Sequence, residues 1–144
     1  MYKSILVPTD GSEITAKALT HAIGLARLTG ARIVTLAVKE PFPYSAVSEM
    51  QPTPPQEFFD AQERVSVRNL TAVKDACAAA GVAVEAASVE AVHPWEAILD
   101  HAKASGCDLV VMASHGRRGM AALLLGSETQ KVLTHSTVPV LVVR

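Results

Sequence analysis

Aromatic residues make up only 4% of this 144-residue chain, although hydrophobic residues make up 49% of it. A core must therefore be built from Ala, Val, Leu and Ile, which is typical of layered α/β folds. Cysteine is equally scarce, and the two cysteines, Cys77 and Cys107, lie apart in apolar surroundings. This pattern excludes a disulfide framework or a zinc site built on cysteines, and it predicts buried, reduced thiols.

An excess of charge of one sign is also lacking. The chain has 13 Lys and Arg against 14 Asp and Glu, dispersed along its length. No general field therefore draws it onto nucleic acid or an anionic membrane. No apolar run reaches membrane-spanning length, and the chain enters its first strand directly after Lys3, without a signal segment. We therefore expect a cytoplasmic protein whose residues 1–144 form a single domain.

Several catalytic motifs are missing from the sequence. It contains no Walker loop, no GxGxxG after the first apolar run and no GxSxG elbow, and its histidines are far apart. Adenylyl transferases of similar fold have His-x-x-His where this chain has residues 9–12. No residue set offers both a positioned base and an arginine clamp, so any ATP hydrolysis is expected to be slow. The sequence predicts a binding protein and not an enzyme.

Short apolar runs alternate with helical periodicity along the whole chain. Strands are predicted at residues 4–7, 31–38, 82–89, 108–114 and 138–143, and helices at residues 13–29, 57–80, 94–105 and 127–135. The alternation implies an α/β fold: a single doubly wound, Rossmann-like parallel sheet of five strands in the order 3-2-1-4-5, with helices on both faces. Residues 40–56 are rich in proline and predict a surface loop.

In such a sheet, ligands bind outside the carboxyl ends of the strands where the winding direction reverses. This places a crevice between the first and fourth strands, bordered by residues 8–12 and 113–129. Gly116 allows close approach of a ligand to the main chain, and Gly126-Ser127 places amides and a hydroxyl at a helix start, which suits phosphate. The alternative is that the glycines only relieve a loop and that Ser127 is only a helix cap.

The spacing of this second turn is distinctive. Ala113-x-x-Gly116, nine residues and then Gly126-Ser127 resembles the nucleotide-binding signature of the universal stress protein family, which reads Gly, two residues, Gly, nine residues, Gly and Ser or Thr. The resemblance covers the whole chain, because residues 5–12, 108–112 and 138–143 also match family motifs. One position departs from the signature, since Ala113 stands where the family has glycine.

The resemblance implies binding of ATP or another adenine nucleotide, with Mg²⁺ as a candidate companion. Pro8, Thr9 and Asp10 would border the adenosine, and Val38 would offer main-chain groups to the adenine. Met112 and Ala113 would line the floor. The remaining residues of the predicted site, around the phosphates, are His115, Gly116, Gly126, Ser127, Glu128 and Thr129.

Four further residues have simpler interpretations. Asp10 either binds a ribose hydroxyl or a metal ion, or it stabilises its own turn and the following helix start. Arg117 and Arg118 either clamp phosphate oxygens or form a solvated pair on a loop. Trp95 lies at helical spacing with other apolar residues, so it is expected in the core and not as a stacking platform.

The last strand predicts a partner. Pro139 cannot donate to a sheet ladder, which indicates an edge strand, yet the residues after it are strongly apolar. The resemblance likewise implies that last strands pair between two subunits, so we expect a homodimer. The predicted interface residues are Val138, Val140, Leu141, Val142 and Val143.

Three hypotheses about function remain open. The first is a stress-response regulator whose ATP occupancy changes the loop at residues 115–125 and hence the contact with an unidentified protein partner. The second is a dimerising module of the same family that has lost the nucleotide, which Ala113 motivates. The third is a slow Mg-dependent ATPase that uses Asp10.

Overall fold

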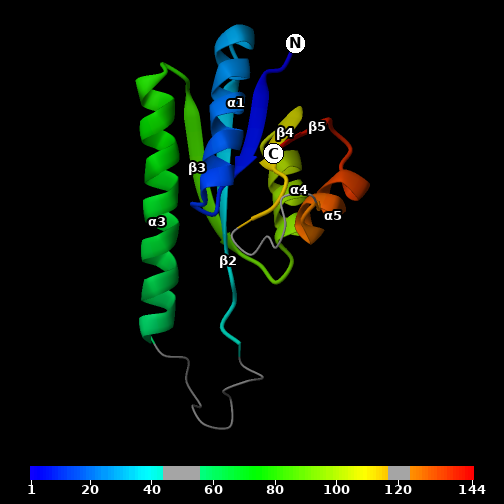
Figure 1. Cartoon of the computed structure of the whole chain (residues 1–144). Coiled ribbons are helices and arrows are strands. Elements are labelled where there is room, and N and C mark those ends of the chain that lie inside the picture. The colour runs from blue at the N-terminus through cyan, green and yellow to red at the C-terminus, as the bar shows by residue number, and fades with distance from the viewer. Residues whose placement is uncertain (44–55, 117–123) are drawn as a thin grey trace.

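The computed structural model describes residues 1–43, 56–116 and 124–144. Its strands form one parallel sheet in the order β3-β2-β1-β4-β5, which confirms the predicted fold (Figure 1). The elements are β1 (Ser4–Pro8), α1 (Glu13–Thr29), β2 (Arg32–Lys39), α3 (Gln56–Ala79), β3 (Val84–Glu90), α4 (Pro94–Ala104), β4 (Leu109–Ala113), α5 (Ser127–His135) and β5 (Val140–Val143). Most of the predicted proline-rich loop lies outside the described residues.

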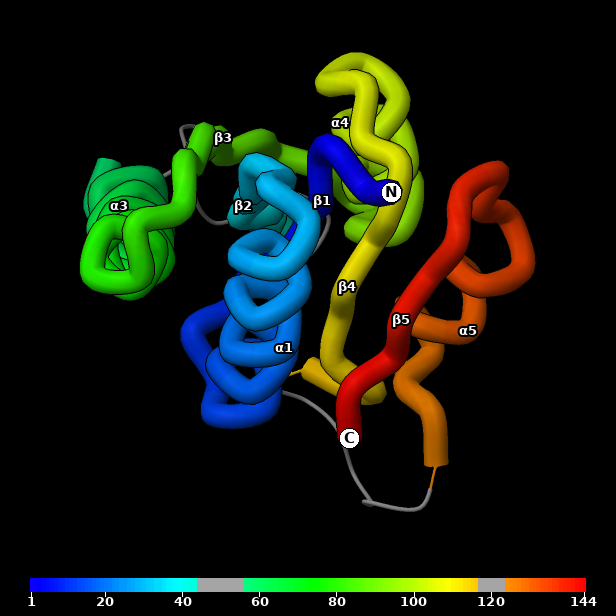
Figure 2. Tube along the Cα trace, turned by 90° about the horizontal axis from the view of Figure 1, so that it is seen from above, coloured from blue at the N-terminus to red at the C-terminus, as the bar shows by residue number. Residues whose placement is uncertain are grey.

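Helices cover both faces of the sheet, and Figure 2 shows α1 and α3 on one side and α4 and α5 on the other. Each face has its own core of small aliphatic side chains, as the composition predicts. One core includes Ile5 and Ile33 under α1 and α3, and the other includes Leu6 and Leu36 under α4 and α5. The central strands are therefore buried on both faces, which explains their continuous apolar runs. In the described part of the chain, no helix is both long and apolar enough to cross a bilayer.

The turn chemistry predicted for the first helix is confirmed. The side chain of Ser12 accepts a hydrogen bond from the Thr15 amide at the start of α1, and Gly30 ends the helix with φ of 75°. The last strand begins later than predicted, at Val140. Val138 lies outside it because the Ser136 hydroxyl both donates to the Val138 carbonyl and accepts from the Val138 amide, which closes a local turn.

The strands do not end at the same level. Pro8, the last residue of β1, is in register with Leu36, whereas β2 and β3 remain paired as far as Lys39 and Glu90. The carboxyl ends of β2 and β3 therefore extend beyond the end of β1 and form one wall beside the predicted crevice. The Thr9 amide donates to the Leu36 carbonyl at 3.0 Å and fixes the start of the turn against that wall.

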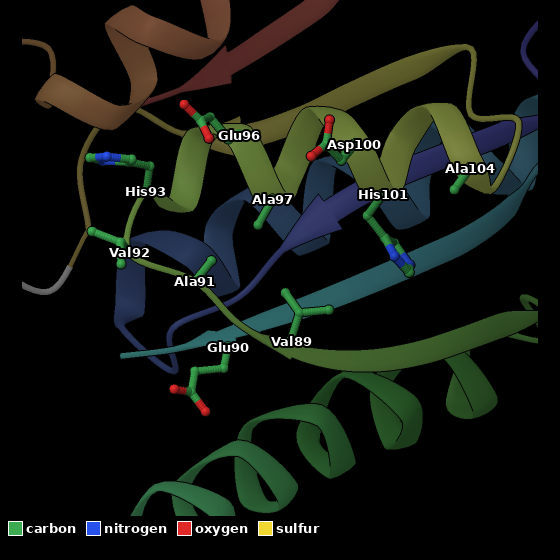
Figure 3. Close-up of a pocket in the computed structure, with 10 residues that line it drawn as sticks. All are labelled: Val89, Glu90, Ala91, Val92, His93, Glu96, Ala97, Asp100, His101 and Ala104. Atoms are coloured by element: carbon green, nitrogen blue, oxygen red, sulfur yellow. The ribbon is translucent and has the colours of Figure 1, made fainter. Parts of the chain in front are cut away.

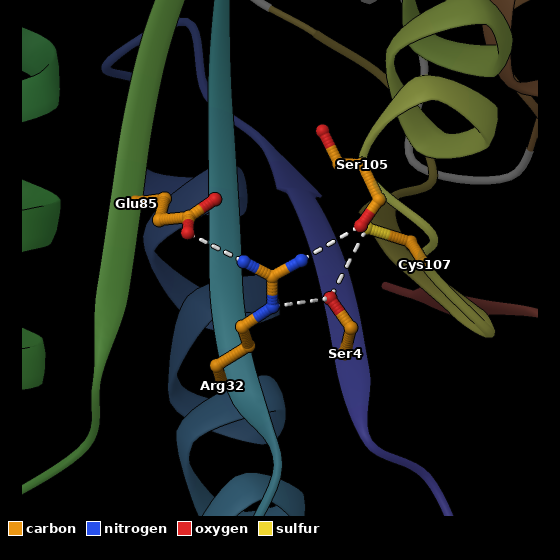
Figure 4. A network of polar contacts seen from close by, with 5 residues as sticks. All are labelled: Ser4, Arg32, Glu85, Ser105 and Cys107. Atoms are coloured by element: carbon orange, nitrogen blue, oxygen red, sulfur yellow. Dashed lines mark hydrogen bonds and ion pairs between the residues drawn. The ribbon is translucent and has the colours of Figure 1, made fainter.

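At the amino ends of the strands, Arg32 connects β1, β2, β3 and the turn after α4 (Figure 4). Its guanidinium donates to the Ser4 hydroxyl and the Ser105 carbonyl, at 3.2 and 2.7 Å, and forms an ion pair with Glu85. The Ser4 hydroxyl also lies 3.5 Å from the Cys107 thiol. Cys107 and Cys77 are free and buried, and burial raises the pKa of both thiols, as expected for structural residues. These contacts join the amino ends of the strands, and they lie away from the predicted site at the carboxyl ends.

Asp108 predicts a measurable pH dependence of stability. Burial opposes ionisation of its carboxyl, but the amides of Lys3 and Ser4 donate to the carboxylate and leave its pKa below the ordinary value of 3.8. The ionised form therefore stabilises the fold above that pH, and this contribution is lost as the pH falls through the lower pKa of the folded state. We expect Asp108→Asn to lower the free energy of unfolding by about 1 kcal/mol at neutral pH, because the carboxylate is partly exposed.

Denaturant unfolding of both proteins between about pH 7 and about pH 2 measures the effect. The difference in free energy should be constant from neutral pH down to about pH 4 and then shrink. A difference that stays the same at low pH would contradict the assigned role of the carboxylate.

Candidate functional site

The two predicted turns meet at the carboxyl edge of the sheet, between β1 and β4. A Cβ atom built on Gly116 would lie only 2.8 Å from Oδ2 of Asp10, closer than real Cβ contacts allow. The turn after β4 therefore lies beside the Asp10 carboxylate of the turn after β1, which would have to shift to admit a side chain at position 116. Residues separated by more than one hundred positions are brought together here, as the strand order 3-2-1-4-5 predicts.

Asp10 performs its predicted structural role. Its Oδ1 accepts hydrogen bonds from the Ser12 amide at 2.9 Å and from the Thr15 hydroxyl at 3.2 Å, so it fixes the start of α1. Its Oδ2 is the atom that lies beside Gly116. One carboxylate oxygen therefore stabilises the turn while the other lies on the side of the crevice, so the two interpretations of Asp10 are compatible in one conformation.

The start of α5 supplies the other wall. The cap of this helix is Gly126, which has no side chain to accept from the first amides, so Ser127 is the first helical residue and not the cap. The Gly126 amide donates to the Ser114 carbonyl at 2.7 Å, and a Cβ on Gly126 would lie 3.2 Å from Cα of His115. The glycine thus lets the helix start lie against the end of β4. The amides of the first turn and the Ser127 hydroxyl are the donors at this position.

Two residues after Ser127 have side chains with structural partners. The Thr129 hydroxyl donates to the Ala113 carbonyl at 3.0 Å and joins α5 to the end of β4. The Glu128 carboxylate accepts from the Trp95 amide at 2.8 Å and so caps the start of α4. Trp95 stacks on His135 with ring centroids 4.6 Å apart and packs against the core, as predicted. Within the site, Glu128 and Thr129 therefore offer main-chain groups.

Ala113, the departure from the family signature, is accommodated without strain. Its side chain belongs to the core under α1, and none of the described residues other than glycine has a positive φ. The extra methyl group therefore packs against the core and requires no change of backbone conformation. Met112, the preceding residue, packs on the opposite face. The sequence alone could not determine the direction of this methyl group.

The other predicted residues lie around this edge. Pro8 and Thr9 follow β1 directly, whereas Val38 lies on the longer strand β2, beyond the residue in register with Pro8. His115 Nδ1 lies 3.2 Å from the Ser114 hydroxyl, which gives it a neutral partner. Arg117 and Arg118 lie outside the described residues.

Sequence reasoning missed two polar residues on α3. Ser66 and Asn69 are buried on the face of this helix that meets the sheet, and the Asn69 side chain lies directly against Gly11. Among the described residues, Ser66 Oγ is a buried side-chain atom without a hydrogen-bond partner. Ser66, Asn69, Val73 and Cys77 recur at helical spacing along the buried face of α3. Two polar residues at positions where this face requires apolar ones were the signal in the sequence that could have identified them.

The arrangement is suited to binding. It combines a carboxylate oxygen, glycine-lined main chain and a helix start, all of which can contact a polar ligand. Over the described ranges, no three or more His, Cys, Asp or Glu side chains are grouped so that they could hold a metal ion. The fold defines a Rossmann-like α/β protein in which the two predicted turns lie side by side at the switch point of its sheet.

Comparisons with known proteins identify the family. A model described as the universal stress protein family matches residues 1–144. The universal stress protein YxiE of Bacillus subtilis is 34% identical, with 100% of both chains covered. The solved structure of MJ0577 from Methanocaldococcus jannaschii has a TM-score of 0.83 at 31% identity, covering 99% of this chain and 96% of that one. The chain therefore belongs to the universal stress protein family.

One further solved structure bears on ligands. A universal stress protein in complex with cAMP superposes on this chain with a TM-score of 0.75 at 24% identity, covering 99% of this chain and 97% of that chain. At this identity the similarity establishes a common fold.

Proposed function

We propose that this chain binds an adenine nucleotide, with ATP as the first candidate, in the crevice between the turn after β1 and the start of α5. The observation that carries the proposal is the close approach of Gly116 to Oδ2 of Asp10, because the prediction assigns Asp10 to the adenosine side and Gly116 to the phosphate side of the site. Family membership supports it, as does the existence of a structural relative in complex with cAMP.

Each side of the crevice has a distinct role in this proposal. Asp10 accepts a hydrogen bond from a ribose hydroxyl through the carboxylate oxygen that faces Gly116, because that interaction avoids repulsion with phosphate. Main-chain groups at Val38 contact the adenine. The phosphates lie at Gly126 and Ser127, where amides and a hydroxyl meet the positive end of the α5 dipole. Binding then acts as the signal, in a cytoplasmic regulator that changes its contact with a protein partner.

The variant Ser127→Asp tests the phosphate side of the site. An aspartate at the first position of α5 interacts favourably with the positive end of the helix dipole, so the fold should be unaffected or slightly more stable. The same carboxylate would repel a triphosphate. We expect isothermal calorimetry with ATP to show a loss of affinity of roughly tenfold or more, with a smaller loss for AMP.

The neutral variant Ser127→Ala is the matched control. It removes only one hydroxyl, so its affinity for ATP should fall by roughly fivefold or less. Equal affinity of wild type and Ser127→Asp for ATP would show that phosphate does not lie at this helix start. If no nucleotide binds the wild type, the hypothesis of a nucleotide-free module is favoured. Turnover above background only with Mg²⁺ would instead favour the ATPase.

The proposal also includes a homodimer through β5, which lies at the edge of the sheet as predicted. Leu141 is 38% exposed on this strand, whereas Val143 belongs to the core. Size-exclusion chromatography with light scattering should give a dimer at micromolar concentration, and Leu141→Lys should shift it toward monomer. The interface is then carried by outward-facing residues such as Leu141, and monomer alone for the wild type would contradict it.

A further inference from the structure

The strand at the other edge of the sheet, β3, is unusually open. Each residue of β3 is at least partly accessible, whereas all residues of β4 and all but the last of β1 are buried. Parallel sheets are normally covered on both faces, so this exposure is atypical of the fold. The segment Val84–Glu90 also lacks the lysine and proline residues with which proteins often block an edge strand.

The main chain of β3 has hydrogen-bonding groups directed away from the sheet. The Ala83 carbonyl accepts from Ile33, and the Ala91 amide donates to Lys39, so both groups point toward β2. Along a strand of a parallel sheet, successive residues direct their amide and carbonyl alternately toward one side of the strand and toward the other. Ala86 and Ser88 lie between residues that face β2, so their amides and carbonyls point to the free edge of β3. Among the described strands, β3 pairs with β2 alone. Its outer edge can accept another strand.

A groove of about 440 Å³ accompanies this edge, between the end of β3 and the side of α4. Figure 3 shows Val89 pointing from the strand toward the helix, with Ala97 and His101 pointing back toward the strand. Ala91 and Ala104 also line the groove. Its floor thus combines small apolar side chains with the imidazole of His101, and the groove leaves space for side chains of a strand placed beside β3. This groove is separate from the crevice between β1 and β4.

Charge around the groove has one sign. Glu90, Glu96 and Asp100 are exposed and line it, and no Lys or Arg is among its lining residues. When a strand adds to a sheet, its main-chain hydrogen bonds give affinity that does not depend on sequence. The pockets and charges beside the strand then select which side chains are accepted. Figure 3 shows the Glu90 side chain pointing away from α4, so Glu96 and Asp100 are the acidic residues on the helix side of a groove that His93 and His101 also line. These two carboxylates favour a segment in which basic residues alternate with small apolar residues.

We propose that the free edge of β3 and the groove beside α4 form a docking surface for an extended basic segment of a partner protein. The segment adds to the sheet as a strand next to β3. Its apolar side chains enter the groove over Val89 and Ala97, and its Lys or Arg side chains reach Glu96 and Asp100. The contact is independent of the nucleotide site, so it stands or fails separately from the proposed function.

A second copy of the chain is a poor occupant of this surface. Symmetric pairing of two β3 strands would place the exposed Glu90 of both copies at one interface, whereas Glu85 already has Arg32 as its ion-pair partner. Like charges across neighbouring strands are destabilising, and the acidic groove would face another acidic groove. Charge therefore favours a basic partner over self-association.

The test uses the full chain and a capped peptide in which Lys and Val alternate, with a peptide of alternating Glu and Val as the mirror probe. We expect the Lys-Val peptide to bind at least about tenfold more tightly by fluorescence anisotropy, with affinity that falls as salt is raised. Amide hydrogen exchange should show new protection at Ala86 and Ser88. Equal binding of the two peptides, or protection confined to other elements, would overturn the proposal.

Two variants separate charge from strand addition. Asp100→Lys should weaken the Lys-Val peptide by roughly fivefold, whereas Asp75→Lys, an exposed aspartate on α3 with the same charge change, should leave it unchanged. Ser88→Pro removes an edge-facing amide without removing a bond to β2, and it should weaken the peptide by roughly tenfold. Equal effects of Asp100→Lys and Asp75→Lys would show that binding depends on the net charge of the protein and not on the groove, and this would contradict the proposal. A peptide-free dimer lost in Ser88→Pro would assign the surface to self-association instead.

Discussion

Gly11→Ala is expected to lower the free energy of unfolding by about 3 kcal/mol, the largest effect of a single added methyl group that this structure predicts. Two causes act together. Gly11 has φ of 79°, in the left-handed region that alanine rarely adopts. An added Cβ would also lie 2.4 Å from Oδ1 of Asn69, so the Asn69 side chain, α3 or the turn after β1 must move. Denaturant unfolding monitored by circular dichroism measures the loss.

Gly30→Ala is a matched control, because Gly30 has nearly the same φ, 75°, but no atom within 4 Å of its added Cβ. It should cost about 1 kcal/mol, from backbone strain alone. A double-mutant cycle with Asn69→Ala isolates the overlap, and we expect the cost of Gly11→Ala to be smaller in the Asn69→Ala background. Equal costs of Gly11→Ala and Gly30→Ala would show that Asn69 moves aside freely.

Phe42→Ala is expected to cost about 3 kcal/mol in the same measurement. Phe42 is only 8% exposed, and its ring packs edge to face on Phe58, with centroids 5.1 Å apart. Phe59 completes the cluster at 6.4 Å from Phe42. The chain has 3 phenylalanines, and all of them meet here, where the segment after β2 joins the start of α3. Loss of the central ring therefore removes two of the three ring contacts within this cluster.

Phe42→Leu separates burial from ring geometry. Leucine keeps much of the apolar area, so the cost should fall to about 1 kcal/mol. A cost of Phe42→Ala below that of Phe42→Leu would mean that the cluster does not hold this junction. Binding of ATP, measured on the same variants, should be retained at temperatures where the fold is intact.

The positions of the strands and most helix boundaries were predictable because they depend on local signals. Buried runs such as residues 109–113 have no alternation, and caps such as Ser12 and Gly30 mark helix ends through side-chain hydrogen bonds and left-handed backbone. The late start of β5 was not predictable from apolarity. It depends on the hydroxyl of Ser136, whose hydrogen bonds to Val138 compete with the ladder.

The candidate site was predictable in its chain segments and not in its side-chain geometry. Glycine spacing located the turns at residues 8–12 and 113–129 because glycine is needed where backbones approach closely. The direction of the Ala113 methyl group and the capping of α4 by Glu128 depend on how separate elements pack. The contact of Asn69 with Gly11 is of the same kind, since it joins α3 to a turn formed much earlier in the chain.

The strand order also determines when the crevice can exist during synthesis. Residues up to Glu90 contain β1, β2 and β3, of which β2 lies between the other two, and the three can pair as soon as they emerge. One edge of β1 then stays unpaired until β4 has been translated, and domains fold from their early segments first. Because the crevice needs β4 and α5, the nascent chain has an open apolar edge before it has a ligand site. Chaperone contact is therefore expected at β1 during this interval, and under the proposed function nucleotide would bind only after α5 has been translated.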